Sequence, residues 1–299
     1  MVITSGADPG SAPFYVASLA GMLERHGIDA DLQLGASNGA MVPLLIKQQA
    51  DASISAGFPG INNHLVDPSV VLVAQVATYA RWWGIVTRAD VPGLAALRGK
   101  KIGIVIGTTS ETFWSVALRH AGLEAADFKP GIVELEPPEL VAAMEHGNID
   151  AFSAWEPWLT RTTHALKDTK ILIDNQGLIE GHAFIFMNRN WIEAHRALAR
   201  SFLAAIIEAD GFLNQEPAKS KQLVGKFLNI PAPMMDELLP KLLFDVELSK
   251  ATLEDTKQDL RVLESRGRIK PGTFDLSRYV YPDLLRDVAP ERVTLETLQ

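Results

Sequence analysis

The sequence predicts an α/β protein made of two lobes. Over the first 76 residues, short β-rich runs alternate with helical patterns, and the same alternation starts again near residue 84. Long amphipathic helical patterns then follow the last predicted strand, at 183–187. Alternation of strands with helices indicates a mainly parallel sheet covered by helices. Because the alternation occurs twice, we expect one such sheet in each lobe.

The first lobe begins with a strand at the start of the chain. The helical pattern that follows is closed by Gly27, the residue type that most often ends a helix in the left-handed conformation. The later strands either alternate polar and apolar residues or are continuously apolar. We expect strands over 2–4, 31–34, 52–55 and 70–76, and helices over 14–26, 40–49 and from about 59.

The second lobe repeats this order, after which the chain returns to the first. We expect strands over 84–87, 101–106, 132–135 and 151–153, and helices over 94–98, 112–121 and 138–147. The returning strand is 183–187, followed by helices over 191–213, 217–228, 234–243 and 252–266 and by no further strand. The predicted lobes are therefore 1–84 with 186–299, and 85–185, joined by a two-strand hinge. Open α/β sheets bind ligands beyond the carboxyl ends of their strands, so we expect the ligand between the lobes.

Composition excludes several classes of function. The 299 residues carry a net charge of −8, which does not suit a nucleic-acid-binding protein, and contain no cysteine for disulfides, thiolate metal sites or a thiol nucleophile. No apolar run approaches the roughly 20 residues of a membrane span. The seven histidines form no metal-binding motif, and no nucleotide or hydrolase motif occurs, so we expect neither metal nor cofactor.

Thr108, Thr109, Ser110 and Glu111 lie where a predicted strand runs into a helix. Backbone N–H groups and hydroxyls at such a point can bind an anion without a basic side chain. The alternative is a capping box, because Thr108 and Glu111 match the S/T-x-x-E pattern. The two interpretations are compatible, since Thr109 and Ser110 stay free when Thr108 caps the helix. Glu111 would suit a ligand amine.

Aromatic residues flank the predicted crossings. Trp155 and Glu156 end a strand, where an indole either covers a ligand or fills the core. Arg81, Trp82 and Trp83 precede the first crossing, and at most one of the two tryptophans should face the ligand, because neighbouring residues of an extended segment point to opposite sides. Arg81 either meets an anionic group or lies in solvent.

A set of short motifs resembles one known family over about residues 5 to 215. In order, they are Ser11-Ala12-Pro13-Phe14, Ala50-Asp51-Ala52-Ser53, 94–103 with its Leu97-Arg98-Gly99-Lys100 centre, Gly107-Thr108-Thr109-Ser110, Gly147-Asn148-Ile149-Asp150-Ala151 and Trp155-Glu156-Pro157. Their order and spacing are similar to those of the extracytoplasmic solute-binding proteins of ABC importers, in the alkanesulfonate, taurine, nitrate and thiamine-precursor (NMT1-like) group.

The resemblance implies a type II periplasmic-binding-protein fold with the ligand clamped between the lobes. Carried over to this sequence, it implies ligand-binding residues at Gly10, Ser11, Phe14, Ser37, Asn38, Ser55, Ala56, Gly57, Arg81, Trp82, Trp83, Thr108, Thr109, Ser110, Glu111, Trp155 and Glu156. Relatives that bind small sulfonates use small hydroxyl-rich loops. The tryptophans of this chain, with Phe58, therefore suggest a larger or aromatic ligand.

The expected function is that of a non-catalytic receptor for a small organic anion or zwitterion. Its expected partners are this ligand and, transiently, an ABC permease in the inner membrane; we expect a monomer in the periplasm, with the signal peptide outside this sequence. The alternative is an enzyme on the same fold that acts on a small aromatic or heterocyclic metabolite. Its base would be His64, Glu156 or His182, and His182 is also a candidate ligand residue because it lies on the return crossing.

Overall fold

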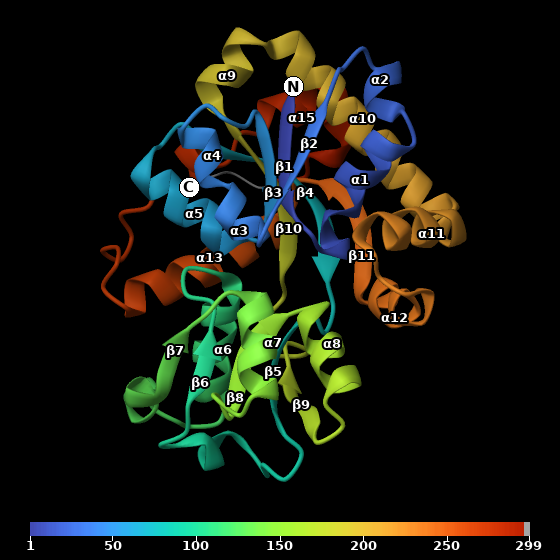
Figure 1. The fold of residues 1–299 in the computed structure, drawn as a ribbon. Coiled ribbons are helices and arrows are strands. Elements are labelled where there is room, and N and C mark those ends of the chain that lie inside the picture. Colours follow the sequence, from blue (N-terminus) through green and yellow to red (C-terminus); the bar gives the residue numbers. More distant parts are fainter. Residues whose placement is uncertain (296–299) are drawn as a thin grey trace. The chain divides into compact units, whose positions relative to one another are not determined.

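The computed structural model describes residues 1–295, and the chain folds into two compact units (Figure 1). Unit 1 comprises Met1–Tyr79 and Gly181–Gln299, and unit 2 comprises Ala80–Glu180. The boundaries predicted from the sequence are 84/85 and 185/186. At the points where the chain leaves and re-enters unit 1, the Tyr79 N–H donates to the Gly181 carbonyl at 2.8 Å, so the two crossing points are neighbours.

Unit 1 contains a six-stranded mixed sheet in the order β11-β4-β10-β3-β1-β2. β1 pairs in parallel with β2 and β3, whereas β10 is antiparallel to β3 and β4, and β11 is antiparallel to β4. The prediction of a mainly parallel sheet is therefore wrong for the β10 side. The strands are β1 Val2–Gly6, β2 Asp31–Gly35, β3 Ala52–Ser55, β4 Val70–Tyr79, β10 His182–Asn188 and β11 Leu242–Glu247.

Strand β11 contradicts the expectation that only helices follow residue 187. The predicted helix over 234–243 ends early, because Pro240 lacks an N–H group and cannot continue it. Beyond the proline, the side chains of Phe244 and Val246 are buried while their neighbours are more exposed, which is the two-residue period of a strand. β11 thus extends the sheet past β4.

Helices cover both sides of this sheet. In Figure 1 the pair α1 and α10 flanks it on one side, with the Phe14 and Phe202 rings edge to face at 5.6 Å, and the pair α5 and α13 lies on the other. The predicted helix 14–26 is two helices, because Gly21 between them is left-handed. The α-helices are α1 Ala12–Leu19, α2 Met22–Arg25, α3 Asn38–Met41, α4 Pro43–Ile46, α5 Gly57–Val66, α9 Arg189–Ala194, α10 Arg196–Gln215, α11 Pro217–Leu228, α12 Ala232–Leu238, α13 Lys250–Ser265, α14 Leu276–Tyr279 and α15 Asp283–Val288.

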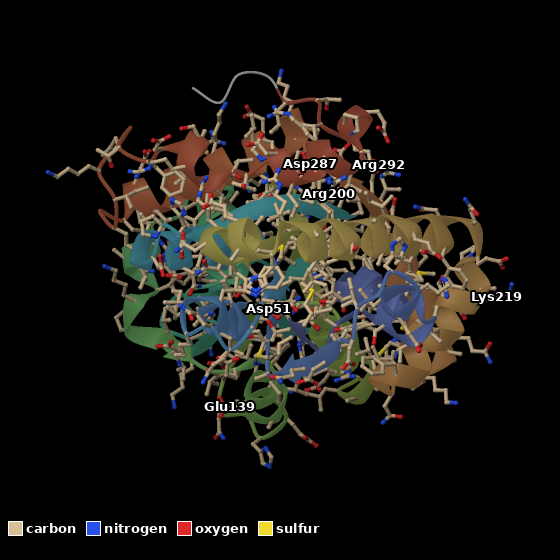
Figure 2. All side chains as sticks on the ribbon, turned by 90° about the horizontal axis from the view of Figure 1, so that it is seen from above. Asp51, Glu139, Arg200, Lys219, Asp287 and Arg292 are labelled. Atoms are coloured by element: carbon tan, nitrogen blue, oxygen red, sulfur yellow. The ribbon has the colours of Figure 1, made fainter. Side chains whose placement is uncertain are left out.

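The C-terminal segment is tied to the rest of unit 1 by ion pairs. Arg292 Nη1 lies 3.3 Å from the carboxylates of Asp210 and Asp245 and donates to the Val246 carbonyl at 2.9 Å. Arg196 pairs with Asp287 at 2.7 Å. Figure 2 shows Asp287 and Arg292 on the red C-terminal segments, beside the yellow helix α10 that carries Arg200. Arg292 therefore links the chain beyond α15 to both α10 and β11.

Unit 2 contains a five-stranded mixed sheet in the order β7-β6-β8-β5-β9. β6 is parallel to β7 and β8, whereas β5 is antiparallel to β8 and β9. Strand β9 was not expected. The strands are β5 Trp83–Arg88, β6 Ile102–Ile104, β7 Ile132–Glu134, β8 Ala151–Trp155 and β9 Thr169–Asp174, and the α-helices are α6 Thr109–His120, α7 Pro137–Glu145 and α8 Trp158–Ala165.

Short 3₁₀ helices complete the fold, at Pro9–Ser11, Leu94–Leu97, Ala125–Asp127, Lys129–Gly131, Leu239–Lys241 and Pro290–Arg292. The predicted helix over 94–98 is the 3₁₀ helix Leu94–Leu97. None of the helices within residues 1–295 combines the length and the apolar character that crossing a bilayer requires.

Candidate functional site

The predicted ligand-binding residues fall into two groups, one in each unit. In unit 1 they follow the ends of β1, β2 and β3 or begin β10. In unit 2 they lie at the start of α6 and on the neighbouring ends of β5 and β8.

In unit 1, the loops after β1 and β2 are joined by the side chain of Asn38. Its Oδ1 accepts from the Gly6 N–H and, at 3.1 Å, from the Ser11 hydroxyl. Its Nδ2 donates to Asp8 Oδ2 at 2.6 Å. Ser37 caps α3 by accepting from the Ala40 N–H at 3.3 Å. The structure therefore brings Ser11 and Asn38 together, but their side chains bond to each other and to the loops.

Asp8, which the sequence analysis did not select, is the centre of this cluster. Its Oδ1 accepts from the Gly10 N–H at 2.9 Å, and the side chain is buried. Burial raises the pKa of Asp8 to about 7, although hydrogen bonds from the backbone of Gly10 and Ser11 act in the opposite direction. A signal was present, because Asp before Pro-Gly is typical of a capped turn.

Two tyrosines enclose the cluster. The Tyr15 hydroxyl donates to the Gly6 carbonyl and accepts from Ser5 Oγ at 3.2 Å. The Tyr79 hydroxyl lies so close to Gly10 that a Cβ at this position would collide with it. Burial, with a smaller contribution from the charge of Asp8, raises the pKa of both phenols. Only glycine fits at position 10.

Phe14 lies in the core of unit 1, packed on Phe202. This contact accounts for its burial without a ligand.

The loop after β3 faces acidic residues of α13. Gly57 begins α5, and a Cβ built on it would lie 2.7 Å from Asp259 Oδ2. His182 Nδ1 lies 2.9 Å from Asp255 Oδ2, and both side chains are buried. The Ser55 hydroxyl is buried and has no hydrogen-bond partner among the described residues, while Ala56 precedes α5 without a side chain to cap it. The buried face of α13 thus carries two aspartates, which the sequence analysis did not select.

In unit 2, the first turn of α6 contains one hydroxyl that the described part of the protein does not use. Thr108 caps the helix by accepting from the Ser110 N–H at 3.3 Å, and its own hydroxyl donates to the Val105 carbonyl at 2.7 Å. Ser110 Oγ lies 3.0 Å from Thr108 Oγ1 and 3.3 Å from the same carbonyl. The Thr109 hydroxyl is buried without a partner among the described residues.

These contacts correct two expectations about this turn. In a capping box, the Glu111 side chain would accept from the backbone N–H of the capping residue Thr108. Here Glu111 Oε2 accepts instead from the N–H of the preceding residue, Gly107, at 2.8 Å. Ser110 is not free, because its hydroxyl bonds within the turn. The Thr109 hydroxyl has no hydrogen-bond partner among the described residues, as predicted. The turn is held on the sheet by Ser153 of β8, whose hydroxyl donates to the Ser110 carbonyl at 3.0 Å.

The aromatic residues of unit 2 form a cross-strand arrangement. Trp83 on β5 is the register partner of Trp155 on β8, which places the two side chains on the same face of the sheet. The Glu156 N–H donates to the Trp82 carbonyl at 2.9 Å. Trp82 and Trp83 are both buried, so burial does not distinguish which of the two would face a ligand.

Asn175, which the sequence analysis missed, holds both crossing segments of unit 2. Its Oδ1 accepts from the N–H groups of Trp82, at 2.7 Å, and Trp83, at 3.0 Å, and its Nδ2 donates to the Ile179 carbonyl at 3.1 Å. Arg81 is exposed and donates to Gln176 Oε1 at 2.6 Å. A single asparagine in a loop carries no sequence pattern that would reveal this role.

The candidate bases of an enzyme all make structural contacts. His182 contacts Asp255, His64 Nδ1 lies 2.7 Å from the Val70 carbonyl, and Glu156 accepts from the N–H and hydroxyl of Thr160 at 3.0 and 2.9 Å. Burial lowers the pKa of His64. No group of three or more histidine and acidic side chains within residues 1–295 is arranged to hold a metal ion. The predicted site residues can interact with a ligand through hydrogen bonds, aromatic contacts and the partial positive charge at the N-terminus of α6.

Comparison with known proteins identifies relatives of this chain. A putative aliphatic sulfonates-binding protein of Escherichia coli (strain K12) is 25% identical over 264 residues, which cover 87% of this chain and 76% of that protein. The taurine-binding periplasmic protein of the same organism is 31% identical over 121 residues, 38% of this chain and 35% of that one. The crystal structure of the periplasmic aliphatic sulphonate binding protein SsuA from Escherichia coli has a TM-score of 0.80 at 22% identity, covering 95% of this chain and 98% of that one.

The structural likeness confirms the predicted fold, since SsuA is a periplasmic binding protein and shares it over nearly the whole chain. All three of these proteins are named as binding proteins and none as an enzyme. The NMT1-like family matches residues 9–228, which is well over half of the sequence and confirms the resemblance that the motifs indicated. The chain is a member of the NMT1-like family.

Proposed function

We propose that this chain is the ligand-binding component of an ABC import system and captures a small organic anion or zwitterion outside the cytoplasm. Its relatives that bind aliphatic sulfonates and taurine support this class of ligand. One observation in this chain carries the proposal: the buried Thr109 hydroxyl has no partner among the described residues and lies in the first turn of α6. A buried hydroxyl without a partner is costly, and a ligand oxygen would remove that cost.

An anionic group would be bound by α6 without a basic side chain. The N-terminus of a helix carries a partial positive charge and directs N–H groups outward, which favours sulfonate or carboxylate oxygens. Ser153 fixes the turn to β8, so the donors are held in place before the ligand arrives. Trp83 and Trp155, paired across β5 and β8, would cover the apolar part of the ligand.

Unit 1 also carries groups that would suit a ligand. Its loops after β1, β2 and β3 offer backbone groups, and Asp259 of α13 lies beside Gly57, where a carboxyl oxygen would suit the amine of a zwitterion. A ligand that binds one conformation of the protein better than another would favour that conformation, and a permease would read the change. We also propose that the protein acts as a monomer in the periplasm.

The test is thermal unfolding with tryptophan fluorescence against ethanesulfonate, taurine, nitrate, benzenesulfonate, benzoate and thymine. A ligand that binds only the folded protein stabilises it by about 2.7 kcal/mol at roughly 100 times its Kd. We expect a saturable shift with the compound recovered unchanged. Consumption of the compound would instead identify an enzyme, and a flat panel would contradict the proposed ligand class.

The Thr109→Val variant tests the site itself. It replaces the unpartnered hydroxyl by a methyl group of similar size, and we expect about tenfold or greater loss of affinity for the compound that shifts the wild type. Thr163→Val makes the same chemical change on α8 and serves as the matched control, with affinity expected to stay within about twofold. Wild-type affinity in Thr109→Val would remove α6 from the site.

A further inference from the structure

We propose that Asp8 is the positioning residue of the ligand-binding loops of unit 1, and that its carboxyl group holds the loops after β1 and β2 in one arrangement through Asn38. This inference rests on the proposed function, in which those loops contact the ligand. Asp8 and Asn38 lie 30 residues apart in sequence and meet at 2.6 Å. The Asp8 carboxyl group joins the Gly10 N–H, in the 3₁₀ helix that follows β1, to the side chain of Asn38, which begins α3 after β2.

The orientation of the Asn38 amide follows from its neighbours. Gly6 offers a backbone N–H, which can only donate, so the Asn38 atom facing it must be the oxygen. The same oxygen accepts from the Ser11 hydroxyl. The amide nitrogen therefore points at Asp8, and position 8 must supply an acceptor.

A carboxyl group is the side chain that meets both demands at position 8. Above about pH 7 the Asp8 carboxyl group is ionised, and its Oδ1 accepts from the Gly10 N–H while its Oδ2 accepts from Asn38 Nδ2, so both oxygens act as acceptors. An asparagine at position 8 has one acceptor, and its amide nitrogen would face the amide nitrogen of Asn38. Two buried donors would then oppose each other without an acceptor.

The surrounding groups keep this arrangement compact. Tyr15 on α1 bonds to the Gly6 carbonyl, and Tyr79 on β4 fills the space beside Gly10. Burial, and to a smaller extent the charge of Asp8, raises the pKa of both phenols above its usual range. The loops after β1 and β2 therefore depend on Asp8 for their relative position, while Asp8 itself need not touch the ligand.

Exchanging the two side chains provides the decisive variant. In the double variant Asp8→Asn/Asn38→Asp, the oxygen of the new amide can accept from the Gly10 N–H and its nitrogen can donate to the new carboxylate. The other carboxylate oxygen can accept from Gly6 and Ser11. The same five groups are thus bonded, with only the direction of the central hydrogen bond reversed.

The experiment measures hydrogen exchange at the Gly6 and Gly10 amides and affinity for taurine and ethanesulfonate, in wild type, Asp8→Asn and the double variant. We expect Asp8→Asn to speed exchange at both amides and to weaken binding, each by about tenfold or more, and the double variant to recover both to within about threefold. The control Ile185→Val, in the buried part of β10, lowers stability without touching the loops and should leave both readouts unchanged.

Two results would overturn the proposal. One is wild-type exchange and affinity in Asp8→Asn; the other is a folded double variant that recovers neither. If Asp8→Asn does not fold, the double variant decides alone, because its recovery requires the paired hydrogen bonds. If the wild type binds neither compound, the proposed ligand class fails, whereas the exchange rates still decide whether Asp8 positions the loops.

Discussion

The pH dependence of stability offers a quantitative test of how Asp8 is buried. The pKa of its carboxyl group rises from 3.8 to about 7, chiefly through burial. Below pH 3.8 the group is protonated in both the folded and the unfolded chain. Between about pH 4 and 7 the unfolded chain loses this proton while the folded chain keeps it, so stability falls as pH rises. Above about 7 the contribution is constant.

The magnitude follows from the two pKa values. At about 1.36 kcal/mol per pKa unit, the rise from 3.8 to about 7 corresponds to about 4 kcal/mol of stability lost between about pH 4 and 7.5. Asp8→Asn removes the titrating group, so its stability should lack this component, whatever its absolute value. Other groups, such as the buried carboxyl of Asp210, titrate in both proteins and cancel in the comparison.

Urea unfolding followed by far-UV circular dichroism measures this difference. Five of the six tryptophans lie in unit 2, so fluorescence would report mainly on that unit, whereas backbone ellipticity reports on both. Free energies of unfolding are compared for wild type and Asp8→Asn at intervals from about pH 4 to 7.5. Parallel pH curves for the two proteins would refute the reasoning, because they would show that Asp8 is already ionised at about pH 4 in the folded chain.

Three further predictions concern stability. Thr109→Val should stabilise the ligand-free protein by about 1 kcal/mol in urea unfolding, because it removes a hydroxyl that is buried without a partner among the described residues. A loss of stability would show that the hydroxyl is bonded. Asn175→Ala should destabilise unit 2 by about 3 kcal/mol, measured by tryptophan fluorescence, because three backbone groups lose their partner; an unchanged midpoint would contradict this role. Arg292→Met should lower the free energy of unfolding by about 2 kcal/mol, measured by circular dichroism, because Arg292 is the counter-charge of the buried Asp210 carboxylate. Adding Asp210→Leu should recover part of this loss, and no recovery would argue against the pair.

Much of the fold could be predicted from local sequence signals. Gly27, in the left-handed conformation, follows the end of α2. A continuous apolar run forms β4, whose side chains are buried on both faces of the sheet. The motifs also identified the family correctly. Strand β9 was missed because its alternation of polar and apolar residues is short, and β11 because it follows a helical pattern after one proline.

The site was harder to predict, because its hydrogen bonds join distant parts of the chain. Thr109 could be selected from its place at a helix start, but that Ser110 bonds back to Val105 depends on the exact path of the turn. Asn38 was among the predicted residues and Asp8 was not, and only the neighbouring positions of β1 and β2 in the sheet bring the two side chains together. The aspartates of α13 lie near the loop after β3 because this helix packs beside α5. The periodicity of the sequence does not reveal that packing.

The hydrogen bond between Tyr79 and Gly181 has a consequence for how this chain can be divided. The chain leaves unit 1 at the end of β4 and returns at the start of β10, and these strands are antiparallel neighbours in the sheet. Such ends are the geometry of a hairpin, so a short turn could replace 80–180 without altering the order of the unit 1 strands. Unit 2 thus behaves topologically as an insertion in a loop, and the sheet of unit 1 is complete without it.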